Sequence, residues 1–71
     1  MTLYSLPANK SAVLHRVRTG KREKAFLGKL GFVRGARIRV SHRCYTNIIV
    51  DVADSRIALS PELSLRIEVL F

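Results

Sequence analysis

The sequence predicts a mainly β domain, a small barrel of five to six short strands with one α-helix inserted at about residues 20–31 and short helical turns. Three observations carry this prediction. Several short segments alternate apolar and polar residues, which is typical of half-buried strands. A single segment has helical spacing instead, and glycines at 31 and 35 mark the change from one pattern to the other. The 71 residues are enough for one domain, residues 1–71.

A short turn and a strand are expected before the helix. Ser5 is placed to cap a single helical turn, and Asn9 suits a left-handed backbone position. Residues 11–18 then alternate strictly. That alternation assigns Val13, His15 and Val17 to the inward face of a first strand.

The helix and the turn after it form a structural corner. Gly31 follows the last helical turn, where positive φ is needed, so Leu27 should pack on Phe32 in a Schellman cap. Gly35 occupies the third position of a tight turn, as a type II turn prefers. The corner comprises Leu27, Leu30, Gly31, Phe32 and Gly35.

Four further strands are predicted at residues 36–44, 48–52, 56–59 and 65–71. In the first of them His42 and Cys44 share the phase of the apolar Ile38 and Val40. Residues 45–47 form a hairpin, and a helical turn begins at Pro61 with Ser60 as its cap. We expect the three phenylalanines in the core, namely Phe26, Phe32 and Phe71. We expect the two tyrosines, Tyr4 and Tyr45, on the surface.

Closure of this sheet into a barrel would remove its edge strands. An SH3-like barrel is the most economical arrangement of these elements. An OB-fold is the alternative, although its helix would come later in the chain.

Composition restricts the function more than the fold. A net charge of +8, from 13 basic and 5 acidic residues, leaves a nucleic acid, an acidic protein and an anionic membrane surface as candidate partners, beside a basic protein whose charge serves solubility alone. No apolar run is long enough for a membrane span, so we expect no direct membrane insertion. The lone cysteine fits a reducing, intracellular setting. The sequence contains no nucleophile elbow, no paired carboxylates and no phosphate-cradling glycine loop, so we expect no enzyme.

Basic residues of the helix, the corner and the following strand are the candidate partner-binding site. They could dock on an acidic protein surface, or equally form a solvated face. A nucleic-acid barrel would add exposed aromatics for stacking, and only the two tyrosines qualify. The candidates are Arg22, Lys24, Arg34, Arg37, Arg39 and Arg43.

A transition-metal site has three weak candidate ligands, His15, His42 and Cys44. The paired spacings that mark zinc sites are absent. Burial of the cysteine as a small apolar side chain is the stronger interpretation. No cofactor is therefore expected, beyond weak Fe²⁺ or other transition-metal binding.

The order of these motifs resembles FeoA, the family of ferrous-iron-transport accessory proteins. The resemblance rests on the basic helix running into Leu30-Gly31-Phe32-Val33-Arg34-Gly35, on Arg56-Ile57-Ala58-Leu59-Ser60, and on Ile67-Glu68-Val69. It covers nearly the whole chain. Many members have Gly-Asp-Pro where this chain has Tyr45-Thr46-Asn47, so the geometry of that hairpin is left open.

The resemblance implies an SH3-like barrel in the cytoplasm that supports FeoB, the membrane GTP-binding transporter of ferrous iron. An interaction module for FeoB is thus the first functional hypothesis. A metal-binding or metal-sensing domain is the second. A nucleic-acid-binding barrel, which rests on charge alone, is the third and is not favoured.

Overall fold

The computed structural model describes residues 1–71, and five antiparallel strands form one curved sheet in the order β4-β3-β2-β1-β5. A 3₁₀ turn (Leu3–Ser5) opens the chain, α1 (Lys21–Lys29) follows the first strand, and α2 (Pro61–Ser64) precedes the last. The predicted mainly β fold with one inserted helix is confirmed. The strands are β1 (Ser11–Val17), β2 (Arg37–Arg43), β3 (Ile48–Val52), β4 (Ser55–Leu59) and β5 (Ile67–Leu70).

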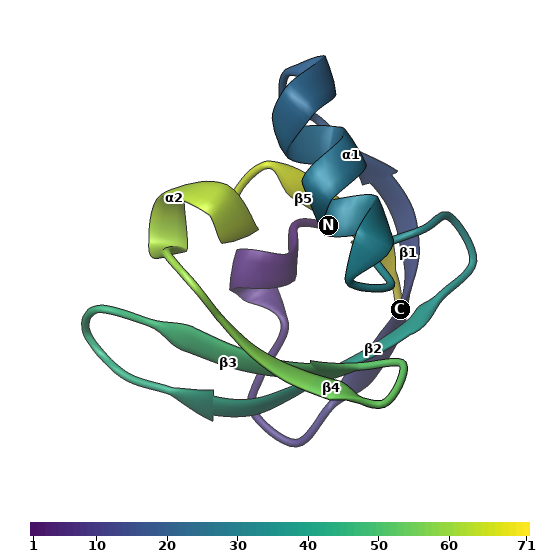
Figure 1. The fold of residues 1–71 in the computed structure, drawn as a ribbon. Coiled ribbons are helices and arrows are strands. Elements are labelled where there is room, and N and C mark those ends of the chain that lie inside the picture. Colours follow the sequence, from purple (N-terminus) through teal and green to yellow (C-terminus); the bar gives the residue numbers. More distant parts are fainter.

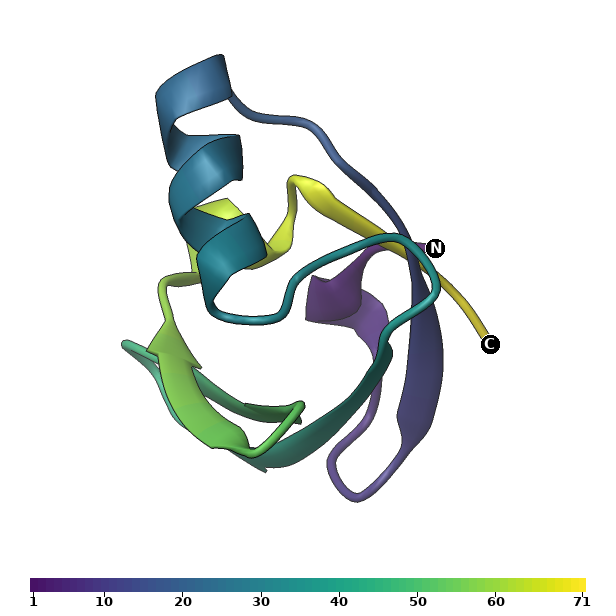
Figure 2. The same ribbon diagram turned by 45° about the vertical axis from the view of Figure 1, so that its right-hand side comes forward.

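The sheet curls around the N-terminal turn, which lies inside its concave side (Figures 1 and 2). Leu3 and Leu6 of this turn are completely buried, together with the inward residues of all five strands. Asn9 follows with a φ of 67°, which confirms its left-handed position. Ser5 does not cap a helix as predicted, because it ends the 3₁₀ turn, with its hydroxyl 3.2 Å from that of Thr2.

Strands β4 and β5 lie at opposite ends of the sheet order and do not pair, so the expected closure is incomplete. Helix α2 and its flanking residues stand between them (Figure 1). The N-terminus covers the outer edge of β5, where the Val69 N–H donates to the Met1 carbonyl at 2.8 Å. Only β4 keeps a free edge.

Two register shifts change which residues of β1 and β2 face the core. Strand β1 buries Ala12 and Leu14 instead of the predicted Val13, which is exposed. The β1–β5 pairing shifts between Leu14 and Arg16, so that Val17 is buried as predicted although Leu14, three residues earlier, is buried too. His15 lies at the shift and is only partly buried. A bulge adds one residue to a strand and reverses the facing of everything beyond it.

The same effect corrects the prediction for β2. Ile38 and Val40 are buried as expected, but the β2–β3 pairing shifts between Val40 and His42. His42 and Cys44 are consequently exposed. The hairpin predicted after them is present, with the Cys44 N–H donating to the Asn47 carbonyl at 3.0 Å.

The corner after α1 has the geometry that its glycines predict. Gly31 has a φ of 109°, and its N–H donates to the Gly28 carbonyl at 3.1 Å. The Phe32 N–H reaches back to the Leu27 carbonyl at 3.0 Å, which completes a Schellman cap. Leu27 and Phe32 are both buried. The cap thus fixes the C-terminal end of α1 on the barrel.

The tight turn at Gly35 and the cap of α2 are also confirmed. Gly35 has a φ of 90°, and the Ala36 N–H donates to the Val33 carbonyl at 2.9 Å. The Ser60 hydroxyl accepts from the Leu63 N–H at 3.1 Å. These contacts set the direction in which β2 and β5 begin.

Two of the three phenylalanines assigned to the core are instead exposed. Phe32 is buried as predicted, whereas Phe26 is 62% exposed and Phe71 is 78% exposed. Leu27 is the only buried residue of α1, so the helix packs through its last turn and leaves Phe26 in solvent. Phe71 lies beyond the end of β5. Both tyrosines are exposed as predicted.

Candidate partner-binding groove

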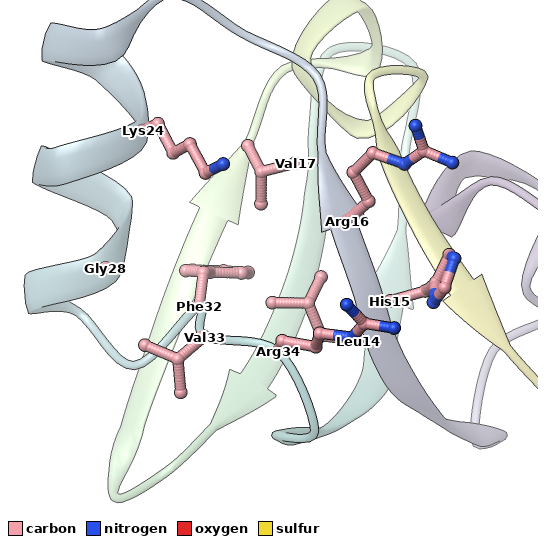
Figure 3. Close-up of a pocket in the computed structure, with 9 residues that line it drawn as sticks. All are labelled: Leu14, His15, Arg16, Val17, Lys24, Gly28, Phe32, Val33 and Arg34. Atoms are coloured by element: carbon pink, nitrogen blue, oxygen red, sulfur yellow. The ribbon is translucent and has the colours of Figure 1, made fainter.

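An open groove of about 680 Å³ lies between α1, β1 and the corner that joins α1 to β2 (Figure 3). The chain leaves β1 at Val17, enters α1 at Lys21 and returns to the barrel only at the corner, so the helix stands off from the strand. The lining residues are Leu14, His15, Arg16, Val17, Lys24, Gly28, Phe32, Val33 and Arg34.

The floor of the groove is the top of the hydrophobic core. Leu14, Val17 and Phe32 are buried there by their neighbours, and Val33 is a half-exposed apolar side chain at the rim. On the helix wall, Gly28 contributes no side chain, and a Cβ built at this position would meet no atom within 4 Å. The helix therefore leaves room beside the apolar floor.

Two cations border this floor, and neither is neutralised within the fold. The Lys24 side chain extends from α1 toward Val17, and Arg34 extends from the corner across β1 (Figure 3). Neither forms an ion pair. No acidic residue lines the groove. Its walls therefore carry net positive charge above an apolar base.

His15 and Arg16 belong to the outer rim. Both project from β1 on the side away from α1 (Figure 3). Arg16 lies with its Nε 3.6 Å from Oε1 of Glu68, a carboxylate that Arg18 also contacts at 2.9 Å. Arg18 donates a hydrogen bond to this carboxyl group and is the main cause of its lowered pKa, with Arg16 adding to it.

Strand β2 does not present the continuous basic row that its spacing indicates. Arg39 contacts Asp51 at 3.3 Å and donates to the Asn9 side chain at 2.9 Å. Arg56 binds the same carboxylate at 2.8 Å, and its hydrogen bond is the main cause of the lowered pKa of Asp51. Arg37 remains exposed without an ion pair.

Arg43 is also engaged within the fold. Its guanidinium donates to the Leu6 carbonyl at 2.9 Å and stacks over the Tyr4 ring at 5.0 Å from the ring centre. Of the six predicted basic residues, the structure thus brings Lys24 and Arg34 together at the groove. Arg22 stays exposed on α1 outside it.

The three candidate metal ligands do not gather. No group of three His, Cys, Asp or Glu residues in the structure could hold a metal ion. His15 lies on β1, while His42 and Cys44 lie near the end of β2. Hydrogen bonding to the backbone of Thr46, and then of Asn47, lowers the pKa of the exposed Cys44 thiol. These residues do not fit a closed metal site.

Sequence reasoning missed the apolar and glycine parts of the groove. Val17 was assigned to the core, and Gly28 to no role. The available signal was a glycine inside a nine-residue helix. Glycine weakens a helix, so its presence there indicates a packing or functional role. No local sequence pattern predicts how close β1 lies to α1, since that distance depends on the geometry of the corner.

A family model for the FeoA domain matches residues 1–70. The chain belongs to the FeoA family. It is therefore an accessory protein of ferrous iron transport, and FeoA is not known as a family of enzymes. No curated protein matches the chain significantly. No helix in the structure has the length and apolar character that a membrane span requires.

Solved structures of FeoA proteins share the fold. FeoA of Stenotrophomonas maltophilia, an SH3 domain protein solved with zinc, is 31% identical with a TM-score of 0.86, over 97% of this chain and 88% of that one. FeoA of Chlorobium tepidum is 25% identical with a TM-score of 0.92, over 99% of this chain and 69% of that one. The predicted SH3-like barrel is confirmed.

The same fold occurs in a protein of another role. A manganese-dependent transcriptional repressor is 16% identical with a TM-score of 0.87, over 99% of this chain and 40% of the repressor. At that identity the likeness concerns the fold alone.

Proposed function

We propose that this FeoA protein acts in the cytoplasm as an interaction module for FeoB, the membrane GTP-binding transporter of ferrous iron. The groove between α1 and β1 supports this proposal most directly. It combines an apolar floor with Lys24 and Arg34, two cations that form no ion pair within the fold. Surfaces of this kind bind partners through a desolvated apolar centre and charged surroundings.

A pull-down with the cytoplasmic GTP-binding domain of the transporter tests this function. We expect capture by the wild-type protein, and a comparison with and without guanine nucleotide reports whether the interaction follows the nucleotide state. Deletion of the gene should also lower ferrous iron uptake under iron limitation. Absence of capture together with normal uptake in the deletion strain contradicts the proposal.

The contact residues are best tested in the groove rather than on β2. Reversing Arg39 to glutamate would place it against Asp51, so lost binding would not be separable from a disturbed sheet. Lys24→Glu and Arg34→Glu have no such partner, and Arg37→Glu is the matched control on an exposed arginine outside the groove. We expect weaker capture with the first two variants and unchanged capture with the third.

Weak transition-metal binding is the second candidate function, favoured by the zinc bound to the Stenotrophomonas relative. His42 and Cys44 are the ligand pair to test, because both are exposed and lie two residues apart. Anaerobic calorimetry with Fe²⁺ and Mn²⁺ tests this site. A heat of binding that is present in the wild type and absent in His42→Ala supports it, and no heat of binding at high protein concentration contradicts it.

A further inference from the structure

We infer that the groove between α1 and β1 binds an acidic segment of a partner protein, with one apolar side chain of that segment seated beside Gly28. This inference rests on the proposed function and names the chemistry of the bound segment. Its three supports are the missing side chain at position 28, the uncompensated positive charge and the class of molecule that fits the groove.

The first support is the space beside Gly28. This glycine lies in α1 with no positive φ, so the backbone does not require it there. Nothing occupies the volume that a Cβ would take. Val17 and Phe32 line the same groove. Filling the space with an apolar side chain would cover this floor and remove apolar surface from water.

The second support is the charge on both sides of that space. Lys24 precedes Gly28 by four residues and so shares its side of the helix, and Arg34 extends from the opposite boundary (Figure 3). The lining contains no carboxylate. An incoming Asp or Glu meets two cations with no competing partner, whereas a basic segment is repelled.

The third support is the class of molecule that fits. Nucleic-acid barrels that bind single strands stack bases on exposed aromatic rings. The one aromatic residue of the groove, Phe32, is buried, and the exposed Tyr4 and Tyr45 line a separate hollow. The groove has walls formed by a helix and a strand. Such walls can enclose a polypeptide segment, whereas a flat bilayer surface would not enter between them. A polypeptide segment is therefore the favoured occupant.

The decisive variant is Gly28→Leu. Because leucine favours helices and a Cβ here meets no atom, the variant should unfold at the same temperature as the wild type or a higher one. The leucine should nevertheless occupy the space that the partner's apolar side chain needs. Ala25→Leu adds the same side chain at an exposed helix position outside the groove and is the matched control.

The probe is a fluorescein-labelled peptide in which one leucine is flanked by glutamates, measured by fluorescence anisotropy. We expect wild type and Ala25→Leu to bind alike, and Gly28→Leu to bind at least about tenfold more weakly. Lys24→Gln and Arg34→Gln should each weaken binding by up to about fivefold, with Lys29→Gln as an unaffected control. Binding should also weaken with salt.

Two altered peptides and one lipid probe complete the test. Replacing the glutamates by glutamines, or the leucine by alanine, should weaken binding to the wild type. The inference is overturned if Gly28→Leu binds like the wild type, or if the glutamine peptide binds equally well. Binding of phosphatidylserine vesicles that is lost in Gly28→Leu would assign the groove to lipid and overturns it as well.

The pull-down of the transporter domain separates this inference from the proposed function. Capture that is equal in wild type and Gly28→Leu supports the function and contradicts the groove as its site. Peptide binding that needs Gly28 without capture of the transporter domain supports the groove and contradicts the function.

Discussion

The two ends of α1 are held in different ways. At its C-terminal end, Leu27 and Phe32 are buried in the core, and two backbone hydrogen bonds close the cap between them. At its N-terminal end, Lys21, Arg22 and Lys24 are exposed, and no side chain caps the helix. One end is therefore fixed by packing and the other is open to a partner. Substitutions should affect stability at the first and binding at the second.

The largest effect is expected from Gly31→Val at the fixed end. A valine there would adopt a φ of 109°, and its Cβ would come within 3.1 Å of the Ala53 Cβ. Backbone strain and overpacking together should lower the free energy of unfolding by about 2–4 kcal/mol. Urea denaturation followed by circular dichroism measures this, and a wild-type midpoint would contradict the assigned role of the corner.

Leu27→Ala should have the next largest effect. Leu27 is 2% exposed and is the only side chain of α1 buried in the core. Its truncation should lower the free energy of unfolding by about 2–4 kcal/mol. Phe26→Ala, one residue earlier and exposed, is the control. Equal losses in the two variants would mean that the helix packs along more of its length.

Gly28→Ala should stabilise the protein slightly. It lies in the last turn of α1, in helical conformation with open space where a Cβ would be, so alanine should raise the free energy of unfolding by about 0.5–1 kcal/mol. Thermal unfolding detects the change as a higher Tm. A lower Tm would show that a neighbour already occupies the groove beside Gly28.

Acid should loosen the sheet rather than the helix. Hydrogen bonds and charges from Arg56 and Arg18 lower the pKa values of Asp51 and Glu68, and a carboxyl group with a lowered native pKa stabilises the fold only while ionised. This contribution is complete above the unfolded-state pKa of about 4 and disappears as the pH falls below it. Because these pairs are exposed, the decrease in Tm should be small, and Asp51→Asn should reduce its pH dependence.

The smallest change in stability is expected at the open end. Lys24→Glu removes no ion pair, so its Tm should match the wild type while capture of the transporter domain falls. A large loss of Tm in this variant would show that the N-terminal half of α1 contributes to the fold.

Local patterns were enough to predict most of the fold. Positive φ at Gly31 and Gly35, the Ser60 cap and the strand positions all follow from the conformational preferences of neighbouring residues. The predicted candidate site was only partly assembled. Lys24 and Arg34 lie at one groove, while Arg39 and Arg43 are engaged elsewhere by groups distant in sequence.

The sequence by itself determined the class of domain, the corner and the surplus of positive charge. The tertiary structure alone decided which charges remain free and which side chains face inward beyond the two register shifts. The inward-facing side chains depend on the two register shifts, which arise from how β1 pairs with β5 and how β2 pairs with β3. The free charges depend on Asp51 and Glu68, since each neutralises arginines that only the folded sheet brings into contact.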